Sequence, residues 1–195
     1  MISDSDQRDR LLGLMRARPV VPNDFATGVL EIIDQLKQSR RVGRLDRLQL
    51  LKVIKVKLQG RADASAERTS SIPDDVVQAL TRAAFSLDDI TCKDEATRER
   101  LRIGILTALP GVEVPTASAI LAWTFPDRFP VIDRRAWRTL SRYQLVSGRE
   151  AGASLGAKQW VAYYKTVERL KGQLLWTPQE IDTWLYRADK EGWDR

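Results

Sequence analysis

The stretch LPGVEVPTASAIL, residues 109–121, places a proline and a glycine between two segments of helical character. Apolar residues recur at helical spacing before it, from about Glu95 to Leu109, and after it, from Thr116 to about Trp123. Gly111 permits a backbone conformation that a side chain would resist, and the small residues 117–119 let the second helix approach the first closely. The stretch therefore predicts two helices joined by a tight turn.

Helical periodicity also covers most of the remaining chain, and no segment shows a useful length of strand alternation. TPQE at 177–180 combines a hydroxyl at the N-cap, proline at the first helical position and glutamate at the third, which predicts the start of the last helix. The pattern predicts an all-α fold. The other segments with this periodicity are 29–36, 45–58, 73–85, 134–143 and 157–170.

Two connectors and one terminal segment interrupt this pattern. Residues 61–71, RADASAERTSS, are small and polar and are predicted to form a loop. FPDRFP, residues 125–130, is predicted to be irregular because its two prolines and the residues before them resist helix. We expect residues 1–24 to be loosely attached. Residues 25–195 would then form the helical domain, with two lobes that share one cleft.

The composition excludes several kinds of catalytic centre. With a single cysteine, Cys92, and no histidine, the usual zinc and iron–sulfur ligand sets are missing, as are Ser-His-Asp and Cys-His arrangements. Acid–base chemistry would fall to Asp, Glu, Lys or Tyr. Carboxylate side chains could hold a magnesium ion, but no sequence motif indicates such a site. We therefore expect no metal or other cofactor. Cys92 is interpreted as an inert small residue near a helix start.

No run approaches the eighteen apolar residues that a membrane span needs, and the start, MISDSDQRDR, is too polar for a signal peptide. We therefore expect a cytoplasmic protein without a membrane partner.

The net charge of +6 is unevenly distributed. Between Lys37 and Arg61, nine basic residues stand against the single acid Asp46. Such clustering suits a polyanion, although a solvated helix face is the alternative interpretation. The candidate contacts in this first cluster are Arg44, Arg47, Lys52 and Lys55. The second cluster consists of Arg128, Arg134, Arg135, Arg138, Arg142 and Arg149.

The segment from LPGV to FPVIDRRAWRTL resembles the helix-hairpin-helix (HhH-GPD) DNA glycosylase superfamily, which includes endonuclease III, MutY, AlkA and the 8-oxoguanine glycosylases. Residues 109–112, Thr116 and Ala117 match its L-P-G-V-G-x-K-T-A motif, and residues 129–131 with Asp133 match its later P-V-D element, with Ile132 inserted. Pro115 and Asp133 stand at the positions of the family's lyase lysine and catalytic aspartate, eighteen residues apart as in the family. The close match covers roughly a fifth of the chain.

The resemblance implies a DNA-binding protein that hydrolyses the bond between a modified or damaged base and its sugar, as in base excision repair. Asp133 would be the carboxylate that stabilises positive charge on the sugar, and Arg134, Arg135 and Arg138 would contact duplex DNA. The alternative interpretation of Asp133 is an N-cap of the helix that follows. The residues that would grip phosphate are Pro110, Gly111, Val112, Glu113, Val114, Pro115 and Thr116.

Two departures from the family pattern affect this expectation. Pro115 lacks the amine that forms a Schiff base, so the chain is predicted to be a monofunctional glycosylase without lyase activity by that route. Glu113 replaces a glycine beside the expected phosphate site. It would either point away or help to hold a monovalent cation that bridges to the phosphate.

Glycosylases stack the extracted base on aromatic or apolar side chains. The candidates here are Trp123, Phe125, Trp137 and Tyr143, for which a place in the core is the alternative. Two other functions also remain open. One is a helix-hairpin-helix module that binds nucleic acid without chemistry, and the other is a helical protein-interaction domain.

Overall fold

The computed structural model of the chain describes residues 4–89, 94–147 and 155–194. The described residues form α-helices and short 3-10 helices and contain no strand, which confirms the predicted all-α fold. The helices are α1 (Asp4–Ala17), α2 (Val29–Gln35), α3 (Lys37–Val42), α4 (Arg47–Leu58), α5 (Asp63–Ser70), α6 (Asp74–Phe85), α7 (Glu95–Thr107), α8 (Val114–Thr124), α9 (Arg134–Arg142), α10 (Ala157–Leu174) and α11 (Pro178–Glu191), with 3-10 turns η1 (Pro22–Asp24), η2 (Gln59–Arg61) and η3 (Ser86–Asp89).

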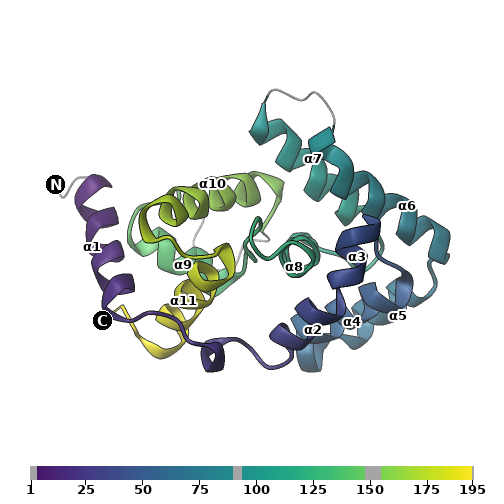
Figure 1. Ribbon diagram of the computed structural model, residues 1–195, viewed down its shortest axis with the longest axis horizontal. Helices are drawn as coiled ribbons and strands as arrows, with labels where there is room; N and C mark the ends of the chain where they lie inside the picture. The colour runs from purple at the N-terminus through teal and green to yellow at the C-terminus, as the bar shows by residue number, and fades with distance from the viewer. Residues whose placement is uncertain (1–3, 90–93, 148–154, 195) are drawn as a thin grey trace.

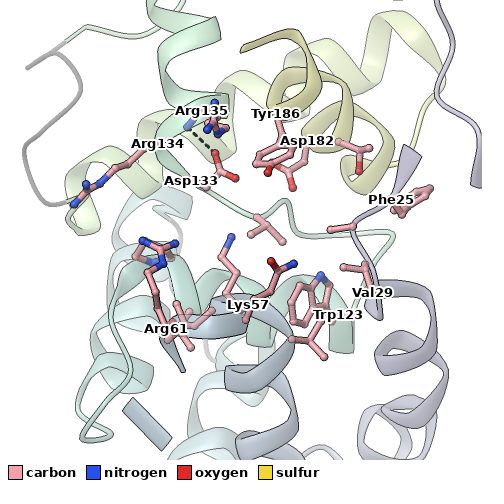
Figure 2. A pocket seen from close by; sticks show the side chains of 18 of the residues that line it. Phe25, Val29, Lys57, Arg61, Trp123, Asp133, Arg134, Arg135, Asp182 and Tyr186 are labelled. Carbon is pink, nitrogen blue, oxygen red and sulfur yellow. Dashed lines mark hydrogen bonds between the residues drawn. The ribbon is translucent and has the colours of Figure 1, made fainter. Parts of the chain in front are cut away.

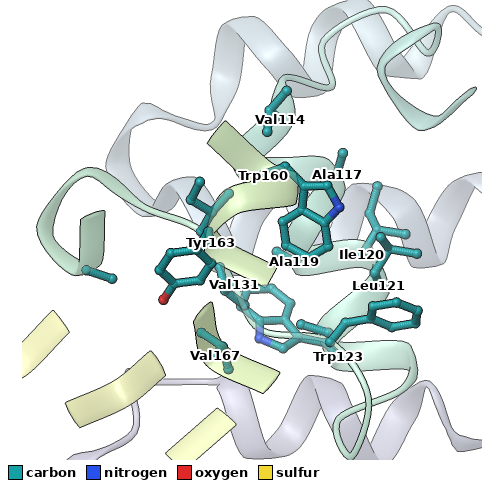
Figure 3. Close-up of a cluster of buried hydrophobic side chains, with 14 of the residues drawn as sticks. Val114, Ala117, Ala119, Ile120, Leu121, Trp123, Val131, Trp160, Tyr163 and Val167 are labelled. Carbon is teal, nitrogen blue, oxygen red and sulfur yellow. The ribbon is translucent and has the colours of Figure 1, made fainter. Parts of the chain in front are cut away.

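The helices form two groups on either side of α8. Helices α1, α9, α10 and α11 lie on one side, and α2 to α7 lie on the other (Figure 1). Helix α8 is buried over nearly its whole length and contacts α2, α3, α4, α7 and α10. Its apolar side chains meet Trp160, Tyr163 and Val167 of α10 (Figure 3). The helix after the quoted turn is thus the centre of the core.

Side chains at the helix ends explain several boundaries. Thr177 accepts a hydrogen bond from the backbone of Glu180, and the Glu180 carboxylate accepts one from the backbone of Thr177, which confirms the predicted start of α11. Asp46 and Asp94 cap α4 and α7 in the same manner, through side-chain oxygens. The capped α11 then packs along α9, where the Thr139 hydroxyl donates to the carbonyl of Leu185 at 2.8 Å.

The prediction of a loop over residues 61–71 is wrong, because this stretch contains α5. Ala62, Ala66 and Thr69 recur at helical spacing and face the interior, while the charged residues between them face solvent. Small side chains make this periodicity weak, and the polar composition conceals it. Residues 1–24, expected to be loosely attached, contain α1, whose Leu11 and Met15 are fully buried.

The turn between α7 and α8 needs glycine for two reasons. Gly111 has φ +87°, in the left-handed region, and a Cβ at this position would lie 2.4 Å from the carbonyl oxygen of Ser65 on α5. The Thr69 hydroxyl of the same helix donates to the carbonyl of Pro110 at 2.9 Å. The turn is therefore seated directly on α5, and the unexpected helix is what fixes its position.

Candidate functional site

A cleft of about 750 Å³ lies between the two groups of helices, lined by residues of both. In Figure 2, Asp133, Asp182 and Tyr186 lie on one wall, and Lys57 and Trp123 lie on the other. The first wall comes from the start of α9 and from α11. The second comes from α4, η2 and α8. The cleft thus collects side chains that are more than a hundred residues apart in the sequence.

The extended segment 129–133 carries Asp133 into this cleft, and its backbone is held from both sides. The Gln179 amide donates to the carbonyl of Phe129 at 3.0 Å, and the N–H of Ile132 donates to the Ser118 hydroxyl at 3.1 Å. The Ile132 side chain, inserted relative to the family motif, is fully buried. Because Ser118 belongs to α8, the segment that positions Asp133 is bonded directly to the helix that follows the LPGV turn.

Asp133 is both a helix cap and a cleft residue. Its Oδ1 accepts hydrogen bonds from the backbone N–H groups of Arg135 and Ala136, each at 2.8 Å. The residue is half-buried and lines the cleft (Figure 2). Within the described part of the chain no donor lies on its Oδ2. The cap interpretation is therefore correct, and it leaves one carboxylate oxygen available on the cleft side.

Asp182 is a cleft residue that sequence reasoning missed. It lies on α11, is almost fully buried, and accepts a hydrogen bond from the Tyr163 hydroxyl at 2.6 Å. Burial and the negative charge of Asp133 raise its pKa to about 8, against the opposing effects of Tyr163, Lys57 and the Val131 N–H. The signal was present, because Asp182 follows Ile181 and precedes Leu185 on the apolar face of a predicted helix.

The expected phosphate-gripping residues are only partly at the cleft. Gly111, Glu113, Pro115 and Thr116 line it, whereas the side chains of Val112 and Val114 are buried in the core. Glu113 is exposed and makes no side-chain cap to α8, and Pro115 has no N–H to offer. The turn and Asp133 nevertheless share one cleft.

The arginines after Asp133 are largely paired with acids of the C-terminal segment. Arg135 and Arg138 both donate to Asp189, and Arg142 donates to Asp189 and Asp194. Arg134 is exposed, and no described residue pairs with its guanidinium. Arg134, Arg135 and Arg138 line the cleft, while Arg149 and Cys92 lie outside the described residues.

The candidates of the first basic cluster lie away from the cleft. Arg47 donates to the carbonyls of Ser70 and Ile72, and Lys52 donates to Gln35. Lys52 and Lys55 line a separate shallow groove beside α2. The charge of Arg44 helps to lower the pKa of Asp74, after the larger effects of Arg47 and Gln78. Two other members of the cluster, Lys57 and Arg61, line the cleft instead. Helical periodicity alone did not indicate which face of α4 borders it.

Of the four aromatic candidates, only Trp123 lines the cleft. Phe125 packs edge-on against Phe85 and Phe129, and Trp137 and Tyr143 are buried. The other aromatic side chains at the cleft are Phe25, from the segment before α2, and Tyr186, from α11. Their distance from the motif in the sequence concealed them.

The described residues contain no cluster of three or more His, Cys, Asp and Glu side chains arranged to hold a metal ion. No helix among them has both the length and the hydropathy required to cross a bilayer. Comparison with known proteins finds no matching family model, no matching curated protein and no matching solved structure.

Proposed function

We propose that this chain binds duplex DNA in the cleft and hydrolyses the N-glycosidic bond of a modified or damaged nucleotide, with Asp133 as the residue that stabilises charge on the sugar. The observation that supports the proposal is the convergence of the LPGV turn and Asp133 on one cleft. The Ser118–Ile132 hydrogen bond joins the two parts of the motif directly.

The shape and charge of the cleft favour this class of substrate. The lining of the cleft includes five basic and four acidic residues. The aromatic rings of Trp123, Tyr186 and Phe25 offer surfaces on which a base could stack. The volume of about 750 Å³ is of the size that accommodates a small-molecule ligand or a flipped nucleotide. Phosphates of the flanking strand would meet Lys57, Arg61 and Arg134 at the rim.

The chemistry assigned to Asp133 is electrostatic. Departure of the base builds positive charge on the deoxyribose, and a fixed carboxylate oxygen stabilises that charge and orients the attacking water. Capping through Oδ1 holds the side chain in place while Oδ2 is free to face the sugar. Pro115 at the lysine position keeps the reaction hydrolytic, since it has no amine to attack the sugar.

The test measures base release from duplexes that carry single modified bases, using the wild type and Asp133→Asn. Asparagine keeps an oxygen for the cap but loses the charge, so release should fall about 10²- to 10³-fold while the fold persists. Asp127→Asn, a carboxylate change on the neighbouring connector outside the cleft lining, is the matched control and should retain activity.

A second measurement does not require the natural lesion to be known. A duplex with a cationic pyrrolidine in place of one sugar should bind the wild type more tightly than a duplex with a neutral tetrahydrofuran, and Asp133→Asn should lose this preference. A wild type that neither releases any base nor distinguishes the two analogues would overturn the proposal.

The second candidate function is a nucleic-acid-binding module without chemistry. Exposed Glu113 in the turn and the missing N–H at Pro115 favour it, because both weaken a phosphate grip of the kind that the family pattern implies. Binding with a steep salt dependence, no base release, and no effect of Asp133→Asn would select this function. Failure to bind DNA or RNA at low salt would leave the protein-interaction domain.

A further inference from the structure

Asp182 is a second carboxyl group of the cleft, and the proposed role of Asp133 does not use it. It projects from α11 toward the same space as Asp133 (Figure 2). Asp182 is 9% exposed. The neighbouring Tyr163 is fully buried, and its hydroxyl donates to Oδ1 of Asp182 at 2.6 Å. The Tyr163 hydroxyl thereby fixes the position of Oδ1.

Four groups surround Asp182, and they come from three elements. Tyr163 faces it from α10, Lys57 from α4, Asp133 from the segment before α9, and the Val131 N–H from the same connector. Burial is the largest effect and raises the pKa, and the charge of Asp133 raises it further. With a pKa of about 8, Asp182 holds its proton at neutral pH. Asp133, by contrast, accepts hydrogen bonds from two backbone N–H groups at the start of α9.

Two carboxyl groups that share a cleft in contrasting environments are the arrangement used to divide acid and charge-stabilising roles in glycosidic bond cleavage. We propose that Asp182 is the general acid of this cleft, donating its proton to the base as it departs, while Asp133 faces the sugar. This inference rests on the proposed function. It adds a substrate class, namely nucleotides whose base is neutral and needs a proton to leave, as opposed to alkylated bases that already carry a positive charge.

The step balances without a cofactor. As the C1′–N bond breaks, its electron pair stays on the base nitrogen, and the proton from Asp182 neutralises the departing base. Water adds its oxygen to C1′ and passes its proton by way of Asp133 to solvent, from which Asp182 is protonated again. The products are the free base and a sugar with a hydroxyl at C1′, so the net change is hydrolysis.

A purely structural role is the alternative, because Asp182 also accepts hydrogen bonds from Tyr163 and Val131. Asp182→Asn separates the two roles, since the amide oxygen can accept the Tyr163 hydrogen bond but the side chain has no acidic proton. Tyr163→Phe is the matched variant that removes the donor and keeps the carboxyl group. Circular dichroism and urea unfolding test whether both variants fold.

The experiment measures single-turnover base release from two sets of duplexes across pH 5 to 10. One set carries neutral modified bases, such as hypoxanthine, uracil and 8-oxoguanine, and the other carries cationic 7-methylguanine. Asp182→Asn should slow release of the neutral base about 10²- to 10⁴-fold and affect the cationic base far less. Wild-type release of the neutral base should decline above a pH of about 8, and this decline should be absent in Asp182→Asn.

The failures of the two proposals are distinguishable. Equal loss on neutral and cationic bases, an unchanged pH profile, or a wild type that releases only cationic bases would overturn the role of Asp182 while the proposed function stands. A wild type that releases neither base would overturn the proposed function itself, and the role of Asp182 with it. Carbon-13 NMR of labelled aspartate gives an independent check. A carboxyl resonance that titrates near pH 8 and is lost in Asp182→Asn supports the proposal, and its absence contradicts it.

Discussion

The two walls of the cleft differ in how their charges are held. On the α9–α11 wall, most ionisable side chains have a partner among the residues that the structure describes, with Arg134 as the exception. Asp133 accepts from the backbone, Asp182 accepts from Tyr163, and Arg135 and Arg138 donate to Asp189. On the α4–η2 wall, Lys57 and Arg61 make neither an ion pair nor a side-chain hydrogen bond with any described residue. One wall is rigidly arranged, and the other offers free positive charge.

In the proposed function, this difference would separate catalysis from phosphate binding. Catalytic groups must be held near one geometry, which needs partners that fix their rotamers. Phosphate contacts need accessible, unpaired cations whose counterions are released on binding. We propose that the α9–α11 wall, here called the paired wall, supplies the catalytic groups, and that the α4–η2 wall, the unpaired wall, binds phosphate.

The largest expected effect on stability comes from Asp182. Its pKa is raised from 3.8 in the unfolded chain to about 8 in the folded protein, so the folded state holds more protons between these values and loses stability as the pH rises through them. Between pH 5 and 8 this amounts to at most about 4 kcal/mol, at 1.36 kcal/mol for each pH unit. Urea unfolding at pH 5 and pH 8 should show this loss of unfolding free energy in the wild type and a much smaller loss in Asp182→Asn. Equal losses would mean that Asp182 is ionised in the folded protein.

Much of the paired wall follows from sequence in principle, because local rules specify it. Asp133 before RRAWRTL and TPQE before the last helix predict caps, and both caps are present. Asp182 at an apolar position of that last helix carried information of the same kind. The pairing of Arg135 and Arg138 with Asp189 could not be predicted from the sequence. These residues are about fifty positions apart and meet only because α9 packs on α11.

The turn at Gly111, which lines the cleft, gives the next largest effect. Gly111→Ala should cost about 3 kcal/mol, because alanine disfavours the left-handed backbone and its Cβ would meet the Ser65 carbonyl at 2.4 Å. Gly104→Ala on α7 is the matched control. No atom lies within 4 Å of its added Cβ, so it should stabilise the protein by about 0.5–1 kcal/mol in urea unfolding. A Gly111→Ala variant as stable as the wild type would show that the turn can move away from α5.

The turn also marks a limit of sequence reasoning. The conformational need for glycine was predictable from LPGV, whereas the close approach to α5 was not. Short helices of Ala, Ser and Thr have a weak periodic signal, and tertiary contacts such as Thr69 with Pro110 decide whether they form. The face of α4 that borders the cleft was unpredictable for a related reason. Basic residues occur on several faces of that helix, and only packing selects among them.

Removing Asp189, the acid that pairs with the arginines of α9, should have a smaller effect on stability. Burial alone would raise the pKa of Asp189, but the hydrogen bond from Arg142 and the charges of Arg138, Arg142 and Arg135 outweigh it and hold the pKa below its usual value. Asp189→Asn should therefore lower stability by about 1–2 kcal/mol at pH 7, since the arginines are partly exposed. The stabilising contribution exists above the unfolded pKa and disappears as the pH falls through the folded one, so the difference should shrink below pH 4.

The same substitution should strengthen DNA binding, because it releases arginines that line the cleft. Asp75→Asn is the matched control, with the same change in net charge at an exposed position on α6. Fluorescence anisotropy with one duplex should show tighter binding for Asp189→Asn than for Asp75→Asn. If both variants gain equally, only the net charge matters, and the arginines of the paired wall take no part.

The smallest effect, and the one that locates the bound strand, concerns the unpaired wall. Lys57→Gln should weaken duplex binding by about 1 kcal/mol, or roughly fivefold, and lower the slope of log K against log salt by about one, because one phosphate contact is lost. Lys52→Gln is the matched control on the same helix, where the amine donates to Gln35 beside a different groove. It should leave both quantities unchanged. The opposite result, a loss in Lys52→Gln and none in Lys57→Gln, would place the strand along α2 and α4. The cleft would then lack a nucleic-acid partner, and Asp133 would be a helix cap whose free oxygen meets only water.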